Sequence, residues 1–112
     1  MIVDDHETFR STARQLLQGE GFDVVGEAGN GASALESFER LKPDLVLLDV
    51  HLPDIDGFEV ARRLSTDGHR AAVVLTSSRD ATEFGSLVRT SGARGFIPKA
   101  ELSGKRLAAL LE

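Results

Sequence analysis

Residues 45–57 have the sequence Leu-Val-Leu-Leu-Asp-Val-His-Leu-Pro-Asp-Ile-Asp-Gly, an apolar run that ends in an aspartate and leads into a loop rich in turn-forming residues. A short apolar run bounded by turn signals is typical of a strand buried in a parallel sheet. We therefore predict a strand over residues 45–49. Side chains at the end of such a strand lie at the carboxyl edge of the sheet, where open α/β folds bind their ligands. Asp49 is thus the first candidate for a functional site.

Two other apolar runs are followed by charged residues. Asp4 and Asp5 follow residues 1–3, and Lys99 follows residues 95–98. We expect these side chains to meet Asp49 at one edge of the sheet. At about 5 Å and an effective dielectric of about 20, each pair of carboxylates repels by roughly 3 kcal/mol. One lysine cancels only one of three charges, and hard oxygen ligands favour magnesium. The cluster therefore predicts a Mg²⁺ site.

The composition is that of one ordinary globular domain. Of the 112 residues, 41% are hydrophobic and 28% are charged. The net charge of −5 argues against direct binding of DNA or RNA, since phosphate recognition needs a basic face. The chain has no cysteine, which excludes disulfides, thiolate metal sites and cysteine nucleophiles. Neither a membrane span nor a signal peptide is recognisable, so we expect a cytoplasmic protein with no membrane contact.

Strand-like and helix-like segments alternate along the chain. This alternation is typical of a parallel sheet covered by helices on both faces, a three-layer α/β/α architecture. Strands are predicted over residues 1–3, 22–28, 45–49, 71–75 and 95–98, and helices over residues 7–18, 32–41, 58–64, 81–90 and 104–111. Gly85 weakens the helix over residues 81–90 by about 1 kcal/mol relative to alanine. The first strand is so short that we expect it to begin before Met1.

The order and spacing of Asp4-Asp5, residues 45–57, Thr76 and Lys99 give the chain a close resemblance to a known family. Over residues 1–112 it is similar to the receiver domain of bacterial two-component response regulators. Asp-Asp-His near the start and Gly-Ala-Arg-Gly-Phe-Ile-Pro-Lys near the end resemble receivers attached to LuxR-type helix-turn-helix domains. The resemblance implies a flavodoxin-like five-stranded parallel sheet with the strand order 2-1-3-4-5. It also implies a switch: a sensor histidine kinase phosphorylates the domain, and the face formed by the fourth helix, fifth strand and fifth helix changes to control an output domain or a partner protein.

The resemblance assigns a role to each residue at the sheet edge. Asp49 would accept the phosphoryl group, since a carboxylate oxygen can form an acyl phosphate. Asp5, Asp49 and the backbone carbonyl of His51 would bind Mg²⁺ directly, and Asp4 would act mainly through a coordinated water. Lys99 would pair with Asp49 and then with a phosphoryl oxygen.

Two further residues resemble those that change their contacts when members of the family are activated. Thr76 would donate a hydrogen bond to the phosphoryl group, and Ser77 would replace it if the register slipped by one residue. Phe96 lies where the family has an aromatic residue that turns inward on activation. In the family a proline often follows the lysine through a cis peptide. Here Ala100 follows Lys99, and a non-proline cis bond costs about 3 kcal/mol, so the conformation of that bond stays open.

Each residue also has a plainer interpretation. One of Asp4 and Asp5 could cap the helix that begins near Glu7, and Asp49 could cap the loop that follows it. Lys99 could be a solvated lysine. Thr76 could be an ordinary strand residue, and Phe96 could be an ordinary core residue.

The histidines offer a second kind of metal ligand. His51 is expected at the mouth of the site, where it would control the approach of water to the acyl phosphate. His6, beside Asp4 and Asp5, suggests a transition-metal site, but we do not expect three adjacent residues to point into one site. His6 and His69 are therefore assigned to the solvated surface.

Three other classes of protein fit parts of the sequence. A phosphatase of the haloacid dehalogenase type also uses an aspartate at a strand end, but it needs a second aspartate where this chain has His51. A flavodoxin-like FMN carrier needs a phosphate-binding loop after the first strand, whereas this chain has Asp-Asp-His-Glu and lacks Trp and Tyr. A pseudo-receiver, with the fold but without the chemistry, is disfavoured because the expected site residues are present.

The expected chemistry is confined to the protein itself. We predict transfer of a phosphoryl group to Asp49 and autodephosphorylation, not an enzyme that acts on a separate substrate. The expected partners are a sensor histidine kinase and a second copy of the chain in a homodimer. DNA would be bound only through an output domain outside these residues. The sequence leaves open a stand-alone receiver and the receiver of a transcriptional regulator.

Overall fold

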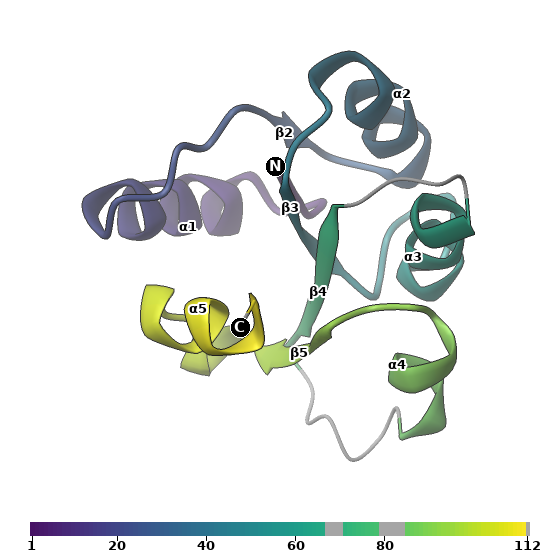
Figure 1. Cartoon of the computed structure of the whole chain (residues 1–112). Coiled ribbons are helices and arrows are strands. Elements are labelled where there is room, and N and C mark those ends of the chain that lie inside the picture. The colour runs from purple at the N-terminus through teal and green to yellow at the C-terminus, as the bar shows by residue number, and fades with distance from the viewer. Residues whose placement is uncertain (67–70, 79–84, 112) are drawn as a thin grey trace.

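The computed structural model of the protein describes residues 1–66, 71–78 and 85–111. It contains a five-stranded sheet in the order β2-β1-β3-β4-β5, with every neighbouring pair parallel, which confirms the predicted fold (Figure 1). The strands are β1 (Ile2–Val3), β2 (Glu27–Ala28), β3 (Leu45–Asp49), β4 (Ala72–Ser77) and β5 (Gly95–Pro98). The helices are α1 (Glu7–Gly19), α2 (Gly31–Leu41), α3 (Gly57–Thr66), α4 (Ser86–Thr90), the 3₁₀ turn η2 (Lys99–Glu101) and α5 (Gly104–Leu111).

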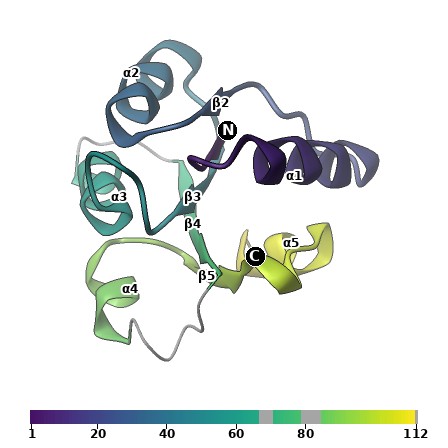
Figure 2. The same cartoon turned by 180° about the vertical axis from the view of Figure 1, so that it is seen from behind.

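Helices cover both faces of the sheet. Helices α1 and α5 lie on one side, and α2, α3 and α4 lie on the other (Figures 1 and 2). Each face has its own core, one that includes Phe38 and Leu48 and another that includes Leu47 and Leu107. Leu47 and Leu48 belong to different cores because successive side chains of a strand point to opposite faces. The molecule therefore has the three layers that the alternating pattern predicts.

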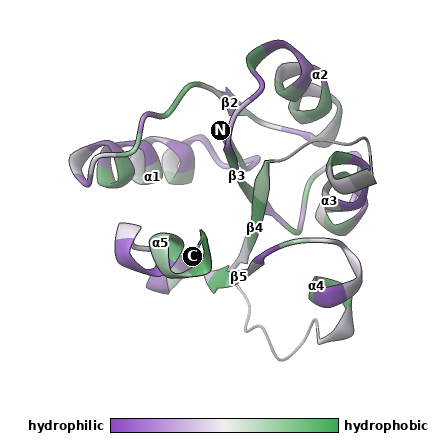
Figure 3. Ribbon diagram, in the orientation of Figure 1, coloured by the Kyte–Doolittle hydropathy of each residue, from purple (hydrophilic) through white to green (hydrophobic). Residues whose placement is uncertain are grey.

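The two central strands are apolar along their length. Strands β3 and β4 pair from Leu45 opposite Ala72 to Asp49 opposite Thr76, and hydrophobic residues dominate both of them (Figure 3). A strand covered on both faces has no reason to alternate apolar and polar residues. The apolar run therefore predicted the bounds of β3 to the residue, and it ends with Asp49 at the carboxyl edge.

The second strand is much shorter than predicted. The prediction spanned residues 22–28, but only Glu27 and Ala28 pair, with Ile2 and Val3 of β1. A strand needs a neighbour to which it can hydrogen-bond, and β1 offers two residues. The prediction of residues 22–26 as strand was therefore wrong, because the pairing partner and not the local sequence limits β2.

The fourth helix also differs from its prediction. It was expected over residues 81–90, of which residues 81–84 lie outside the described part of the chain. Within that part α4 starts at Ser86, and Gly85 precedes it as the N-cap with φ of 39°. Glycine tolerates this positive φ, so Gly85 suits the position directly before the first residue of α4.

Among the described residues, no helix is long and apolar enough to span a bilayer.

The loop after β3 is held tightly against the strand. The amide of Gly57 donates to the carbonyl of Val50 at 2.9 Å, and a side chain at Gly57 would collide with the backbone of Asp49 and Val50. Asp54 accepts hydrogen bonds from the amides of Gly31 and Ala32 at 2.7 and 2.9 Å, which ties the loop to the start of α2. These amide bonds lower the pKa of Asp54. These contacts hold the loop in place beside Asp49 and beside the start of α2.

Candidate functional site

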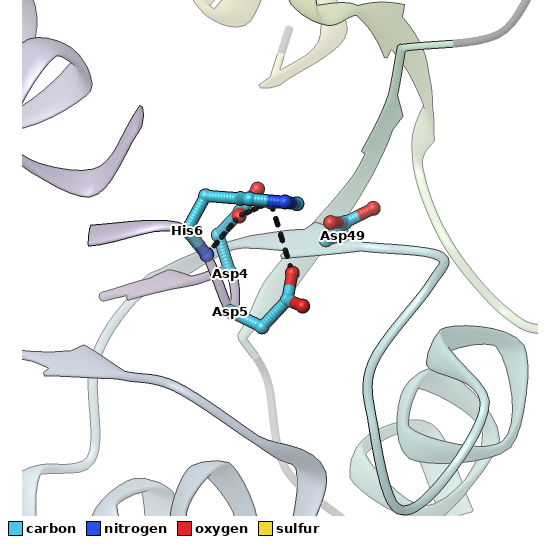
Figure 4. A group of neighbouring side chains, drawn as sticks. All are labelled: Asp4, Asp5, His6 and Asp49. Atoms are coloured by element: carbon cyan, nitrogen blue, oxygen red, sulfur yellow. Dashed lines mark hydrogen bonds and ion pairs between the residues drawn. The ribbon is translucent and has the colours of Figure 1, made fainter. Parts of the chain in front are cut away.

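Three aspartates and a histidine form one cluster at the carboxyl edge of the sheet. Each of Asp4, Asp5, His6 and Asp49 offers a ligand atom, and these atoms all lie within 4.8 Å of one another (Figure 4). Asp4 and Asp49 are buried, while the side chain of Asp5 is 36% exposed. The register explains the meeting, because Val3 pairs with Leu48 and so places the ends of β1 and β3 side by side. The structure thus brings together the three carboxylates that the sequence singled out.

A tight turn makes three consecutive residues converge. Asp4 Oδ1 accepts a hydrogen bond from the backbone amide of His6 at 2.8 Å and lies 3.1 Å from His6 Nδ1. The same Nδ1 lies 3.0 Å from Asp5 Oδ1 (Figure 4). The expectation that adjacent residues do not point into one site was therefore wrong. The cause is the Asp4 carboxylate, which folds the chain back before α1 by binding an amide two residues later.

Lys99 lies between two buried carboxylates. Its Nζ is 2.6 Å from Asp4 Oδ2 and 3.3 Å from Asp49 Oδ2. The pairing with Asp49 was expected from the sequence, whereas the closer contact with Asp4 was not. The ring of Phe9 packs against the ammonium group, 4.5 Å from Nζ to the ring centroid. The Lys99–Ala100 peptide is trans, which settles the question left open by the sequence.

The cluster shifts the ionisation of its members in opposite directions. Burial raises the pKa of Asp49, the charge of Asp4 raises it further, and the His51 amide and Lys99 oppose this shift. Burial alone would lower the pKa of Lys99, but the two carboxylates outweigh it and the net pKa is raised. The site therefore favours the charged form of Lys99 and disfavours the charged form of Asp49.

The residues expected to act as the switch lie on β4 and β5. Thr76 is buried opposite Asp49 in the sheet, and its hydroxyl donates to the backbone carbonyl of Ile97 at 2.7 Å. Ser77 is buried next to it. Phe96 is partly buried against the core on the α2–α3 face. In this structure the Thr76 hydroxyl therefore ties β4 to β5.

His51 is exposed beside Asp49, as expected for a residue at the mouth of the site. Its backbone amide donates to Asp49 Oδ1 at 3.1 Å. The other histidine assigned to the surface, His69, lies outside the described residues. His6 is largely exposed, in keeping with its assignment, yet its Nδ1 belongs to the acidic cluster.

Two residues of α1 support the cluster and were missed in the sequence. Besides Phe9, Arg10 donates from Nη1 to the carbonyl of Asp4 at 2.5 Å and from Nε to Glu27 at 3.0 Å. Arg14 holds the other oxygen of Glu27 at 2.6 Å. In the sequence, Phe9 is one more apolar residue on a helix and Arg10 one more charge. Only the packing of α1 beside β1 and β2 reveals their contacts.

The donor set fits a hard divalent cation. Three carboxylates face one another, and the ammonium of Lys99, 2.6 Å from the buried Asp4 Oδ2, is the cation beside them among the described residues. One ammonium group leaves two of three negative charges uncompensated, and uncompensated charge is costly in a buried site. Carboxylate and carbonyl oxygens are the ligands that magnesium prefers. The cluster is thus suited to a cation whose ligands come from the ends of β1 and β3.

Comparison with known proteins identifies this arrangement. The family model of the response regulator receiver domain matches residues 1–112. The chain belongs to the response regulator receiver family. The resemblance drawn from the sequence is therefore confirmed, and the haloacid dehalogenase and flavodoxin alternatives are excluded.

Relatives of this receiver domain include transcriptional regulators. It is 41% identical over 110 residues to a Pseudomonas aeruginosa protein whose name describes a transcriptional regulator, covering 97% of this chain and 53% of the relative. It is 30% identical to the DNA-binding transcriptional activator EvgA of Escherichia coli K12, covering 98% and 54%. The crystal structure of a LuxR-family two-component response regulator from Aurantimonas has a TM-score of 0.87, with 28% identity and coverage of 99% and 83%. The receiver thus spans about half the length of the curated relatives.

Proposed function

We propose that Asp49 is the phosphoacceptor of this receiver and that a sensor histidine kinase supplies the phosphoryl group. The observation that carries the proposal is the position of Asp49, a buried carboxylate at a strand end that meets the ammonium of Lys99 and the carboxylates of Asp4 and Asp5. In the transfer, a carboxylate oxygen of Asp49 forms a bond to phosphorus while the P–N bond of the phosphohistidine breaks. The electron pair of that bond returns to the imidazole ring of the kinase.

The acidic cluster is proposed to work with Mg²⁺. Asp5, Asp49 and the backbone carbonyl of His51 would hold the ion, with Asp4 acting through water. When bound, Mg²⁺ neutralises charge on the phosphoryl oxygens and on the carboxylates. Lys99 would keep its charge throughout and exchange its contact with Asp49 for one with a phosphoryl oxygen. Two cations would then balance a pocket that phosphorylation makes more negative.

The proposed switch begins at Thr76. To donate to a phosphoryl oxygen, its hydroxyl must leave the carbonyl of Ile97, which it binds at 2.7 Å. That change would remove a side-chain link between β4 and β5 next to Phe96, and so alter the α4–β5–α5 face. A bistable contact of this kind is the usual way in which a local charge change reaches a surface.

The wider role follows from the relatives. We propose that this receiver controls a DNA-binding output domain, since the curated relatives are transcriptional regulators about twice its length. Homodimerisation through the altered face and a cytoplasmic location belong to the same proposal. The protein would process its own aspartyl phosphate and no separate substrate.

The test is phosphorylation of the purified receiver by acetyl phosphate with Mg²⁺, read by intact-mass spectrometry. We expect one phosphoryl group on the wild type, none on Asp49→Asn, and normal labelling of Asp44→Asn, an exposed aspartate just before β3. Equal labelling of wild type and Asp49→Asn would overturn the proposal. An unlabelled wild type would identify a pseudo-receiver.

A further inference from the structure

The imidazole of His6 shares the acidic cluster with the three carboxylates. Its Nδ1 lies 3.0 Å from Asp5 Oδ1 and 3.1 Å from Asp4 Oδ1, and all four ligand atoms lie within 4.8 Å (Figure 4). Two donors that bind one ion at about 2.1 Å and at right angles are about 3.0 Å apart. In the structure these contacts are a hydrogen bond and ion pairs of the imidazole, and their lengths also match the spacing of ligands on adjacent positions of one ion.

We propose that His6 is a fourth protein ligand, which makes this site bind nitrogen-preferring divalent ions such as Co²⁺ and Ni²⁺ more tightly than its carboxylates alone would. The proposal rests on the metal site of the proposed function and adds its selectivity. Magnesium gains little from an imidazole, whereas cobalt and nickel bind imidazole nitrogen well and stand above it in general affinity.

The ion and Lys99 can share Asp4, because they use different oxygens. Lys99 Nζ contacts Oδ2 at 2.6 Å, while His6 approaches Oδ1. An ion held by His6 and Asp5, with Oδ1 of Asp4 reached through a water, therefore leaves the lysine contact in place. Asp49, within 4.8 Å of the same group, is the remaining carboxylate of the set.

The backbone holds His6 in position for this role. Its amide donates to Asp4 Oδ1 at 2.8 Å, so the residue is anchored at the start of α1 with extended backbone angles. The side chain is 68% exposed. It can therefore turn toward an ion without disturbing the core, and its removal leaves no cavity.

The proposal predicts a metal-specific effect of one substitution. Isothermal titration of the purified receiver with Mg²⁺ and with Co²⁺, for wild type and His6→Ala, measures both affinities. We expect the Co²⁺ affinity of His6→Ala to fall by roughly tenfold or more, as for loss of a metal-orienting group, and the Mg²⁺ affinity to change by less than about twofold. Asp44→Asn is the control, since this exposed carboxylate is not one of the four clustered ligands, and it should keep the wild-type ratio of affinities.

A second readout tests direct coordination. Paramagnetic Co²⁺ should shift and broaden the imidazole proton signals of His6 in the NMR spectrum of the wild type. Unchanged His6 signals, an unchanged Co²⁺ affinity in His6→Ala, or an equal loss for Mg²⁺ and Co²⁺ would overturn the role of His6 as a ligand. By contrast, failure of the wild type to bind Mg²⁺ would count against the metal site of the proposed function itself.

Discussion

At the scale of single residues, the site is a balance of opposed charges. Asp4 and Asp49 are both buried and share one ammonium group, that of Lys99. Burial is the main reason that the pKa of Asp49 is raised, so the protein carries this carboxylate at the expense of stability. Such a cost is typical of residues at functional sites, which agrees with the proposed role of Asp49 as phosphoacceptor.

Replacement of Asp49 by asparagine should therefore stabilise the metal-free protein. Two carboxylates about 5 Å apart repel by roughly 3 kcal/mol at an effective dielectric of about 20, and the lost contact with Lys99 cancels part of the gain. We expect the free energy of unfolding by urea, without divalent cations, to rise by about 1–2 kcal/mol. Asp44→Asn, at the exposed opposite end of β3, should change it by less than about 0.5 kcal/mol. A less stable Asp49→Asn protein would contradict this account of the cluster.

Thr76 gives a second prediction, which concerns the resting state of the switch. Thr76→Val removes the donor to the buried carbonyl of Ile97, which should cost about 1–2 kcal/mol of unfolding free energy. Amide hydrogen exchange in β5 should become faster, because that bond joins β5 to β4. Thr76→Ser retains the hydroxyl and should keep near-wild-type exchange in β5. If both variants exchange alike in β5, the hydroxyl does not hold the strand.

At the scale of elements, prediction from sequence succeeded where local and long-range signals agree. Strands β3 and β5 and helix α5 have the predicted bounds, because an apolar run or stripe ends at clear turn signals. The prediction of β2 was too long because the length of this strand is set by its pairing with β1, which no local sequence pattern indicates. In the site, the carboxylates followed from strand ends. The contacts of His6, Phe9 and Arg10 did not, since they depend on a three-residue turn and on the placement of α1.

Helix α1 supplies the third prediction through its two arginines. Both bind Glu27 of β2, but only Arg10 also binds the carbonyl of Asp4, so only Arg10 joins the helix to the acidic cluster. Arg10→Gln should lower the Mg²⁺ affinity by roughly tenfold, as expected when a group that orients metal ligands is lost. Arg14→Gln removes a comparable ion pair and should leave the Mg²⁺ affinity unchanged. Isothermal titration of the two variants with Mg²⁺ measures both affinities. An equal loss of Mg²⁺ affinity in both would show that Arg10 acts only through general stability.

At the scale of the whole molecule, the acidic cluster is one part of a chain whose net charge is −5. The sheet gathers residues from β1, β3 and the end of β5 at one edge, so its folding concentrates negative charge that the unfolded chain keeps apart. A cation can stabilise such a fold in two ways: by general screening of the net charge, which any salt provides, or by binding to the cluster.

These two effects can be separated, because only site binding follows mass action at low concentration. Mg²⁺ that binds the native state alone should raise the free energy of unfolding by about 2.7 kcal/mol at a concentration 100 times its dissociation constant. Sodium chloride at the same ionic strength should give little of this gain. Asp5→Asn should remove most of the Mg²⁺-specific part, whereas Asp23→Asn, exposed and remote from the cluster, should retain it. Urea unfolding in both salts measures the difference. Equal stabilisation by sodium and magnesium would mean that the fold tolerates its acidic edge without a bound ion.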